Sequence, residues 1–222
     1  MRDKGEKVNF SDREATLEAY IAIFAGSDTT AVAFRSVFYH LMRNPEALSK
    51  AHAEIDAAIQ GGSLSTPIKY SETTTKLPYM CACIKEGLRM HPSVGLSMQR
   101  HAPNGGIELT GKFIPAGYRI GMNPAVAHYD KGIFGQDVDE YRPERWLVSP
   151  EASKAMDRNM LTLGAGTRTC IGKNISLVEL HTLVPEILRR FDLHMTHGHE
   201  WTTLNRWFHK QLGLQVKLRR RL

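Results

Sequence analysis

Apolar residues recur at helical spacing through the first 44 residues of the chain. Ser11 and Glu14 have the spacing of a capping box, which predicts that a helix starts near Asp12. No proline follows before position 45, so this helix can continue to about position 44. One face carries the apolar stripe Leu17, Tyr20, Phe24, Ala31, Phe34, Phe38 and Leu41. Because other faces near its middle are also apolar, we expect a long, central and buried helix.

The middle of this helix contains a run of poor helix formers. Residues 25–30 read Ala-Gly-Ser-Asp-Thr-Thr, and Asp28 falls on the apolar stripe itself. Glycine and serine together can kink a helix or open its hydrogen-bond ladder, and threonine can bond back to the ladder. Two interpretations remain open for this segment, a groove that serves a function and a harmless kink.

Shorter helices follow in the pattern. A cap followed by proline predicts a helix over residues 45–59, and Leu77-Pro78 is expected to open another over 78–90. A short polar helix is expected from Ser71. A last helix is expected to reach about residue 190, with a kink at Pro185. Its helix-periodic apolar residues are Ile171, Ile175, Val178, Leu183 and Ile187.

The pattern shortens to strand length in two parts of the chain. Strands are predicted over 94–100, 106–109, 113–122, 191–195 and 212–218. Glycine and proline separate the first three, and the last two are expected to close as a pair. Residues 131–160 are expected to be mostly irregular. The fold class predicted from the pattern is mainly α with a small antiparallel β region.

Two charged residues lie on an otherwise apolar helix. Glu86 and Arg89 have i,i+3 spacing among apolar neighbours. A buried carboxylate–guanidinium pair is costly without further partners, so a third charged group is expected. Arg145 in the turn Pro-Glu-Arg-Trp at 143–146 is the candidate.

Composition limits the class of protein. The net charge is +6, and three cysteines give no disulfide framework, which indicates a reducing compartment. The basic run at 217–221 is typical of a solvated terminus, and nothing else indicates a nucleic-acid partner. No run of about 18 apolar residues and no signal peptide is present, so location is not assigned.

Cys170 lies in a loop of small residues just before the last predicted helix. Glycines at 164, 166 and 172 allow a sharp bend or a close approach, and Arg168 stands two positions before the cysteine. A helix N-terminus stabilises a thiolate, so the loop could present a sulfur anion to a bulky group. The alternative is a buried structural cysteine after a glycine turn.

Four motifs stand in one order along the chain. They are Ala-Gly-Ser-Asp-Thr-Thr at 25–30, Glu-Gly-Leu-Arg at 86–89, Pro-Glu-Arg-Trp at 143–146 and Gly-x-Arg-x-Cys-x-Gly at 166–172. Together they resemble the C-terminal half of a cytochrome P-450, a haem-thiolate monooxygenase, from about residue 10 to the end. Residues 165–174 resemble filamentous-fungal members, which often serve secondary metabolism. The resemblance implies an incomplete P-450 fold, a single partial domain over 1–222, with 1–10 disordered.

The resemblance also implies roles at the matched positions. Cys170 would be the axial ligand of the iron of haem b. Arg168 and Arg100 would bind the haem propionates. Gly166 and Gly172 would let the loop pass close to the porphyrin.

Asp28 and Thr29 match the acid–alcohol pair that relays protons during oxygen activation. Glu86, Arg89 and Arg145 would form a buried structural triad, without a catalytic role. Residues 93–98 and the turn near 202–208 match the segments that contact substrate.

The chain departs from the family pattern in two ways. Leu163 stands where a phenylalanine usually shields the thiolate, so haem potential and loop order could shift. The N-terminal half of the family fold, with its membrane anchor and pocket-roofing helices, has no counterpart in the sequence. Full-length eukaryotic relatives are anchored to the endoplasmic reticulum membrane.

The function implied by the resemblance is haem-dependent monooxygenation. One atom of O₂ would enter a lipophilic small molecule, with electrons from NADPH-cytochrome P-450 reductase or a similar donor. The alternative is a truncated, catalytically incompetent haem-binding fragment, which the missing half motivates. A haem-binding or redox module without oxygenase chemistry is a third hypothesis, against which Asp28 and Thr29 argue.

Overall fold

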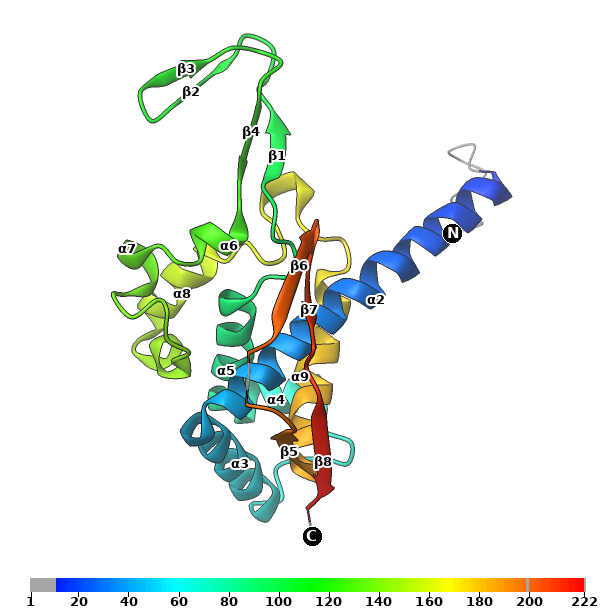
Figure 1. Cartoon of the computed structure of the whole chain (residues 1–222), viewed down its shortest axis with the longest axis vertical. Coiled ribbons are helices and arrows are strands. Elements are labelled where there is room, and N and C mark those ends of the chain that lie inside the picture. The colour runs from blue at the N-terminus through cyan, green and yellow to red at the C-terminus, as the bar shows by residue number, and fades with distance from the viewer. Residues whose placement is uncertain (1–10, 199, 222) are drawn as a thin grey trace.

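The structure is a computed structural model that describes residues 11–198 and 200–221. Figure 1 shows a body of packed helices, a β-ribbon that extends from one end of it, and one long helix that projects to the side. The expectation of disorder over 1–10 lies outside the described residues.

The long helix α2 (Asp12–Arg43) starts where the capping box predicts. The Ser11 hydroxyl accepts the Glu14 backbone N–H at 3.3 Å, and the Glu14 carboxylate accepts the Ser11 N–H at 2.8 Å. The helix is continuous through residues 25–30, where the Thr29 hydroxyl bonds back to the Ala25 carbonyl at 2.8 Å. The segment therefore keeps its α-helical assignment despite its poor helix formers.

The expectation of a buried helix is wrong for the first half of α2. Tyr20 is 66% exposed and Ile23 is 73% exposed, because little of the described chain packs against residues 12–27. The Phe24 ring, whose centroid lies 6.2 Å from that of Phe208, does make a contact with the body. Figure 1 shows this part projecting away from the body. By length and mean hydropathy of 1.2, α2 could cross a membrane, although helices of a soluble core pass the same test. This finding qualifies the expectation that the chain holds no such segment.

The second half of α2 is the centre of the main hydrophobic core. Against it pack α3 (Pro45–Gln60), α5 (Pro78–Met90) and α9 (Lys173–Arg190), and α4 (Tyr70–Lys76) packs on α5 and α9. The fully buried members of this core include Val37, Leu41, Ile55, Leu77, Met80, Ile84, Val184 and Leu188.

Helix α9 buries a different face from the one expected. Leu180, Val184 and Leu188, at i, i+4 and i+8, point into the core. Ile175 and Val178 of the predicted stripe are exposed, at 67% and 46%. The sequence offers two apolar faces, and the described chain covers one of them. Pro185 lies inside the assigned helix.

Residues 124–159 contain more helix than expected. They form α6 (Pro124–Ala127), α7 (Lys131–Phe134), a 3₁₀ helix (Pro143–Leu147) and α8 (Pro150–Asn159). Helix α8 was missed by the expectation of irregular structure over 131–160. The start of α8 has the usual sequence features of a helix N-terminus. The Ser149 hydroxyl accepts the Ala152 N–H at 3.1 Å as an N-cap, and proline follows the cap.

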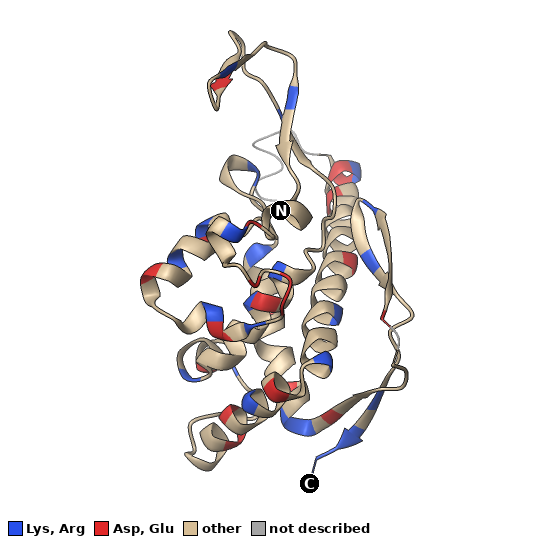
Figure 2. Ribbon diagram, turned by 60° about the vertical axis from the view of Figure 1, so that its left-hand side comes forward, with Lys and Arg blue, Asp and Glu red and all other residues tan. Residues whose placement is uncertain are grey.

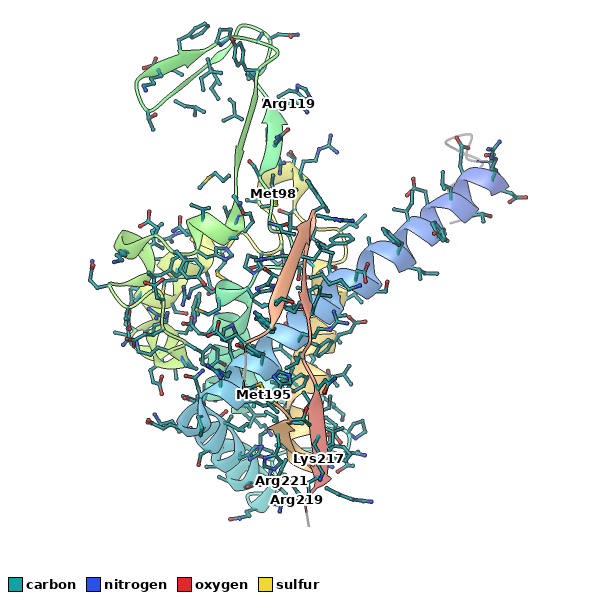
Figure 3. All side chains as sticks on the ribbon, in the orientation of Figure 1. Met98, Arg119, Met195, Lys217, Arg219 and Arg221 are labelled. Carbon is teal, nitrogen blue, oxygen red and sulfur yellow. The ribbon has the colours of Figure 1, made fainter. Side chains whose placement is uncertain are left out.

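The strands form four antiparallel pairs, as the predicted β region requires. They are β1 (Met98–His101) with β4 (Arg119–Met122), β2 (Ile107–Leu109) with β3 (Lys112–Ile114), β5 (Phe191–Met195) with β8 (Val216–Arg220), and β6 (Thr202–Arg206) with β7 (Phe208–Leu212). The first two pairs make the extended ribbon, with Met98 at its base and Arg119 farther out (Figure 3). The closing pair is confirmed, but its second strand begins at Val216, because the chain first completes the β6–β7 hairpin.

The basic run near the C-terminus is part of the sheet. Figure 2 shows its positive residues along β8, and Figure 3 labels Lys217, Arg219 and Arg221 there. Arg219 pairs with Asp192 at 3.0 Å, and Arg221 pairs with Asp56 at 2.6 Å. The interpretation as a solvated terminus is therefore wrong for Arg221, which is 21% exposed, whereas Arg219 remains 74% exposed.

Candidate functional site

The loop between α8 and α9 is held by its own backbone. The Cys170 N–H donates to the Leu163 carbonyl at 2.8 Å, and the Thr169 N–H donates to the Gly166 carbonyl at 3.1 Å. Gly164 and Gly166 both have φ in the left-handed region that favours glycine.

 The backbone angle φ is 71° at Gly164 and 65° at Gly166. At Gly166 glycine is needed for the turn itself, because a Cβ there would meet open space, whereas at Gly164 a Cβ would also lie 3.3 Å from the Arg168 carbonyl oxygen.

The Cys170 side chain is exposed, two residues before the N-cap of α9 at Gly172. This exposure contradicts the alternative of a buried structural cysteine. The other two thiols differ, because burial raises the pKa of Cys81 to about 11 and raises the pKa of Cys83 as well. Cys170 is therefore the most exposed of the three cysteines.

Cys170 lines a mostly apolar pocket of about 110 Å³ between α2, α5 and α9. The other lining residues are Thr29, Thr30, Ala33, Leu88, Ser93, Val94, Thr162, Leu163, Ser176, Leu177 and Leu180. Three residues singled out in the sequence, Thr29, Leu163 and Cys170, thus meet at one pocket. Asp28 is not among the lining residues, and it lies half-exposed on α2.

Hydrogen bonds hold α2 in place beside the pocket. The Ser93 hydroxyl donates to the Thr29 carbonyl at 2.7 Å. The Thr30 and Ser176 hydroxyls lie 3.2 Å apart, which links α2 to α9. These bonds hold α2 at Thr29 and Thr30 against two neighbouring segments.

The two segments predicted to contact substrate lie together. Val94 forms a β-bridge with Phe208, and the Gly95 N–H donates to the Trp207 carbonyl at 3.2 Å. The Asn205 amide donates to the Gly95 carbonyl at 2.8 Å. Since Val94 lines the pocket, the β6–β7 turn is anchored beside it.

Glu86 is the centre of a fully buried charge cluster. Its carboxylate accepts two bonds from the Arg89 guanidinium, both at 2.9 Å, and one from Arg145 at 2.9 Å. The Trp146 indole N–H donates to it at 2.8 Å. All three charged side chains are at most 2% exposed. The structure therefore brings the expected triad together, with tryptophan as a further partner.

Sequence reasoning missed the fourth charge of this cluster. Asp137 pairs with Arg145 at 2.9 Å and also with Arg142 at 2.5 Å. Arg145 further donates to the Phe134 and Asp137 carbonyls. Two buried guanidinium groups face one buried carboxylate, so this second acid balances the charge. The excess of arginine in the predicted triad was the available signal.

Arg168 and Arg100 are exposed and lie outside the pocket lining. Within residues 11–198 and 200–221, neither guanidinium has a carboxylate partner, and Arg100 donates only to the Gln99 carbonyl at 2.9 Å. Both cations remain available to an anionic group.

A Cβ at Gly172 would lie 3.9 Å from the Cys170 sulfur, an ordinary contact.

The sequence profile described as Cytochrome P450 matches residues 1–219. The chain belongs to the cytochrome P450 family. The prediction of a fungal P450, C-terminal half, is confirmed by relatives. The chain is 46% identical over 205 residues to the cytochrome P450 monooxygenase ACRTS1 of Alternaria alternata, covering 92% of this chain. It is 42% identical over 217 residues, or 97% of this chain, to the cytochrome P450 monooxygenase gsfF of Penicillium aethiopicum.

The P450 chain spans about half the length of these relatives or less. The match covers 54% of ACRTS1 and 42% of gsfF. A third relative, the cytochrome P450 monooxygenase cicH of Emericella nidulans, is 44% identical over 200 residues, which is 90% of this chain and 40% of cicH. The helices and small antiparallel sheets described above are consistent with the P450 fold.

Proposed function

We propose that Cys170 is the axial ligand of haem b, and that residues 1–222 form a single partial domain of a P450 monooxygenase. The observation that carries this proposal is the meeting of the exposed Cys170 thiol and Thr29 at one apolar pocket. A thiol exposed on a pocket whose other lining is mostly aliphatic suits a large apolar cofactor with a metal centre.

The residues present fit a haem in three respects. Cys170 supplies the thiolate, the aliphatic pocket lining suits the porphyrin, and the exposed Arg168 and Arg100 supply cations for its propionates. Leu163 gives an apolar contact beside the sulfur in place of the ring that the family pattern favours. When bound, thiolate-ligated haem supplies activation of O₂ for insertion of one oxygen atom into a substrate.

Thr29 and Asp28 are proposed to transfer protons between solvent and the pocket. The Thr29 hydroxyl donates its own proton to the Ala25 carbonyl at 2.8 Å, so its oxygen is free to accept another. Asp28 is half-exposed, which allows its carboxylate to exchange protons with solvent. The pair thus links the pocket to water through adjacent residues of one helix.

The substrate is proposed to be a lipophilic small molecule, because most of the pocket lining is apolar. Val94 and the β6–β7 turn lie where such a molecule would be contacted. Electrons are proposed to come from NADPH-cytochrome P450 reductase or a similar donor.

The ligand assignment is tested by spectroscopy. The haem-loaded chain, reduced under CO, should show the red-shifted Soret band of thiolate-ligated haem. Cys170→Ala should abolish that band, because the sulfur ligand is lost. Cys81→Ala is the matched control and should keep it, since this thiol lies half-buried on α5. Identical spectra for wild type and Cys170→Ala would overturn the assignment.

A second candidate function is haem binding without productive turnover by this chain on its own. The exposure of Tyr20, Ile23 and Phe24 favours it, because water then reaches the apolar helix that leads into the pocket. Turnover with NADPH and reductase separates the two functions. Hydroxylated product supports the monooxygenase, whereas NADPH consumption that yields only hydrogen peroxide supports the second candidate.

A further inference from the structure

The C-terminal end of α5 is closed by side chains from other segments. A helix leaves most of its last carbonyl groups without backbone partners inside the helix. In α5 the Gly87 carbonyl accepts the backbone N–H of the C-cap residue His91 at 3.2 Å. In α5 the carbonyls of residues 87–90 accept, in order, from the hydroxyl of Ser36 at 2.7 Å, the hydroxyl of Thr162 at 3.1 Å, the ring of His128 at 3.1 Å and the hydroxyl of Tyr129 at 3.0 Å. Two of these four donors also connect α5 to the chain segment that leads to Cys170.

His128 makes contacts in two directions. Its ring is fully buried, and Nε2 accepts the Leu161 backbone N–H at 2.8 Å. Because a backbone N–H can only donate, the neutral ring carries its proton on Nδ1, which donates to the Arg89 carbonyl at 3.1 Å. The Arg89 guanidinium in turn donates to the His128 carbonyl at 3.0 Å. Arg89 and His128 are joined by reciprocal bonds, and Leu161 is attached to that pair.

The ring of His128 stays neutral in its place. Burial lowers its pKa to about 4, and the positive charge of Arg89 acts in the same direction, while the hydrogen bond to the Arg89 carbonyl opposes them. The Nε2 lone pair is therefore available to the Leu161 amide at neutral pH.

Leu161 is the first residue of the hydrogen-bonded loop that ends at Cys170. The Leu161 carbonyl accepts the Gly164 N–H at 2.9 Å, and the Leu163 carbonyl accepts the Cys170 N–H at 2.8 Å. The Thr162 hydroxyl adds a second bond from this segment to α5. Hydrogen bonds thus connect the buried charge cluster through His128 to Leu161, and from Leu161 through the Leu163–Gly164 peptide to Cys170.

We propose that His128 is a positioning residue, which sets the orientation of the Cys170 loop through its hydrogen bond to the Leu161 amide. This proposal rests on the proposed function in one respect, since the loop is taken to present the haem ligand. His128 does not line the pocket and acts through Leu161.

Three substitutions at position 128 separate positioning from simple structural support. His128→Gln places an acceptor oxygen at about the reach of Nε2 and so keeps the bond to Leu161. His128→Asn reaches only as far as Nδ1, so it keeps a donor for the Arg89 carbonyl and loses Leu161. His128→Leu loses both. Tyr129→Phe is the matched control, because it removes the cap of the Met90 carbonyl without touching the loop.

Two readouts are measured on the full chain. Amide hydrogen exchange at Leu161 and Cys170 is followed without haem, and the Soret band of the reduced CO complex is recorded with haem. His128→Asn and His128→Leu should speed exchange at both amides by about tenfold or more and lower the fraction of thiolate-type band. His128→Gln and Tyr129→Phe should stay within about threefold of wild type in exchange, with the band retained.

The outcomes distinguish this proposal from the proposed function. Wild-type exchange and a full thiolate band in His128→Asn would overturn the positioning role, even if His128→Leu fails to fold. If His128→Gln were as impaired as His128→Asn, the bond to Leu161 would not be the cause, which also overturns it. A wild-type chain that lacks the thiolate band overturns the proposed function, and the exchange measurement without haem still decides whether His128 orders the loop.

Discussion

The two sides of the Cys170 pocket are enclosed to different extents by the described chain. On the α5 side, Glu86, Arg89 and Arg145 are at most 2% exposed, and each has several hydrogen-bond partners. On the α2 side, the helix is packed from Thr30 onward, whereas Tyr20 and other apolar residues before the pocket are exposed.

The difference shows which kinds of side chain the packed body of the described chain must provide with partners and which it can leave exposed. A buried charge without a partner costs several kcal/mol, so the charge cluster needs all its members within the packed body. An exposed apolar side chain costs far less, so the first half of α2 can remain uncovered without loss of the α5 side. The stability of the body should therefore depend on α5 and hardly at all on residues 12–27.

The largest expected effect is from Glu86→Gln. It leaves the buried Arg89 and Arg145 guanidiniums without their central counter-charge, and we expect a loss of about 3–5 kcal/mol in the free energy of unfolding. Urea denaturation of the full chain measures it. Glu46→Gln is the control, because Glu46 is 84% exposed in its pair with Lys50 and should matter by about 0.5 kcal/mol or less. A loss below about 1 kcal/mol in Glu86→Gln would remove the contrast between the two sides.

A matched pair of substitutions tests the two halves of α2 directly. Leu41→Ala should cost about 2–5 kcal/mol of unfolding free energy, because Leu41 is fully buried in the main core. Leu17→Ala, on the same helix, should change it by about 0.5 kcal/mol or less, since Leu17 is 55% exposed. Equal losses in the same denaturation measurement would mean that the first half of α2 is packed in solution.

Among these predictions, the smallest change in the free energy of unfolding is expected for each buried histidine when the pH is lowered from 7 to 5. Burial is the main cause that lowers the pKa of His40 to about 3 and the pKa values of His91 and His128 to about 4, from 6.5 in the unfolded chain. Between pH 6.5 and 4 the unfolded chain binds more protons than the folded one, so stability falls as pH falls through this window. Each histidine should account for up to about 2 kcal/mol between pH 7 and pH 5.

Replacement of one histidine checks the sign and the source of this effect. His91 donates through Nε2 to the His209 carbonyl at 2.7 Å, and glutamine offers a donor at about the same reach. His91→Gln should therefore keep the fold and flatten the fall of stability in urea titrations from pH 7 to pH 5. A steeper fall in the variant would contradict the sign given above.

The element order of the helical body could be predicted from the sequence, because its boundaries carry local signals. The capping box at Ser11 and the prolines at 45 and 78 mark helix starts within a residue or two. Helix α8 was missed although Ser149 caps it, since its ten residues are mostly polar and bury only Met156. The choice of buried face on α2 and α9 could not be predicted, because both helices are apolar on more than one face and the neighbours decide which is covered.

The site was predictable where a residue type is itself the signal. Cys170, Thr29 and the arginine-rich cluster around Glu86 could be selected by motif, and the fold brings them to the pocket and to α5. His128 and Asp137 could not be selected, because a single histidine and a single aspartate in a polar segment look like surface residues. The role of His128 depends on its contact with Arg89, 39 residues away on α5, and the role of Asp137 depends on its ion pairs with Arg142 and Arg145.

The end of α5 also has a consequence for the order of folding. Its Leu88 carbonyl is satisfied by Thr162, 74 residues later in the chain, and its Arg89 and Met90 carbonyls by partners 39 residues later. During synthesis these carbonyls stay hydrated until the later segment emerges, so α5 cannot reach its final packing before then. We therefore expect the helix that carries Glu86 and the loop that carries Cys170 to reach their final packing together, after the loop segment has been synthesised.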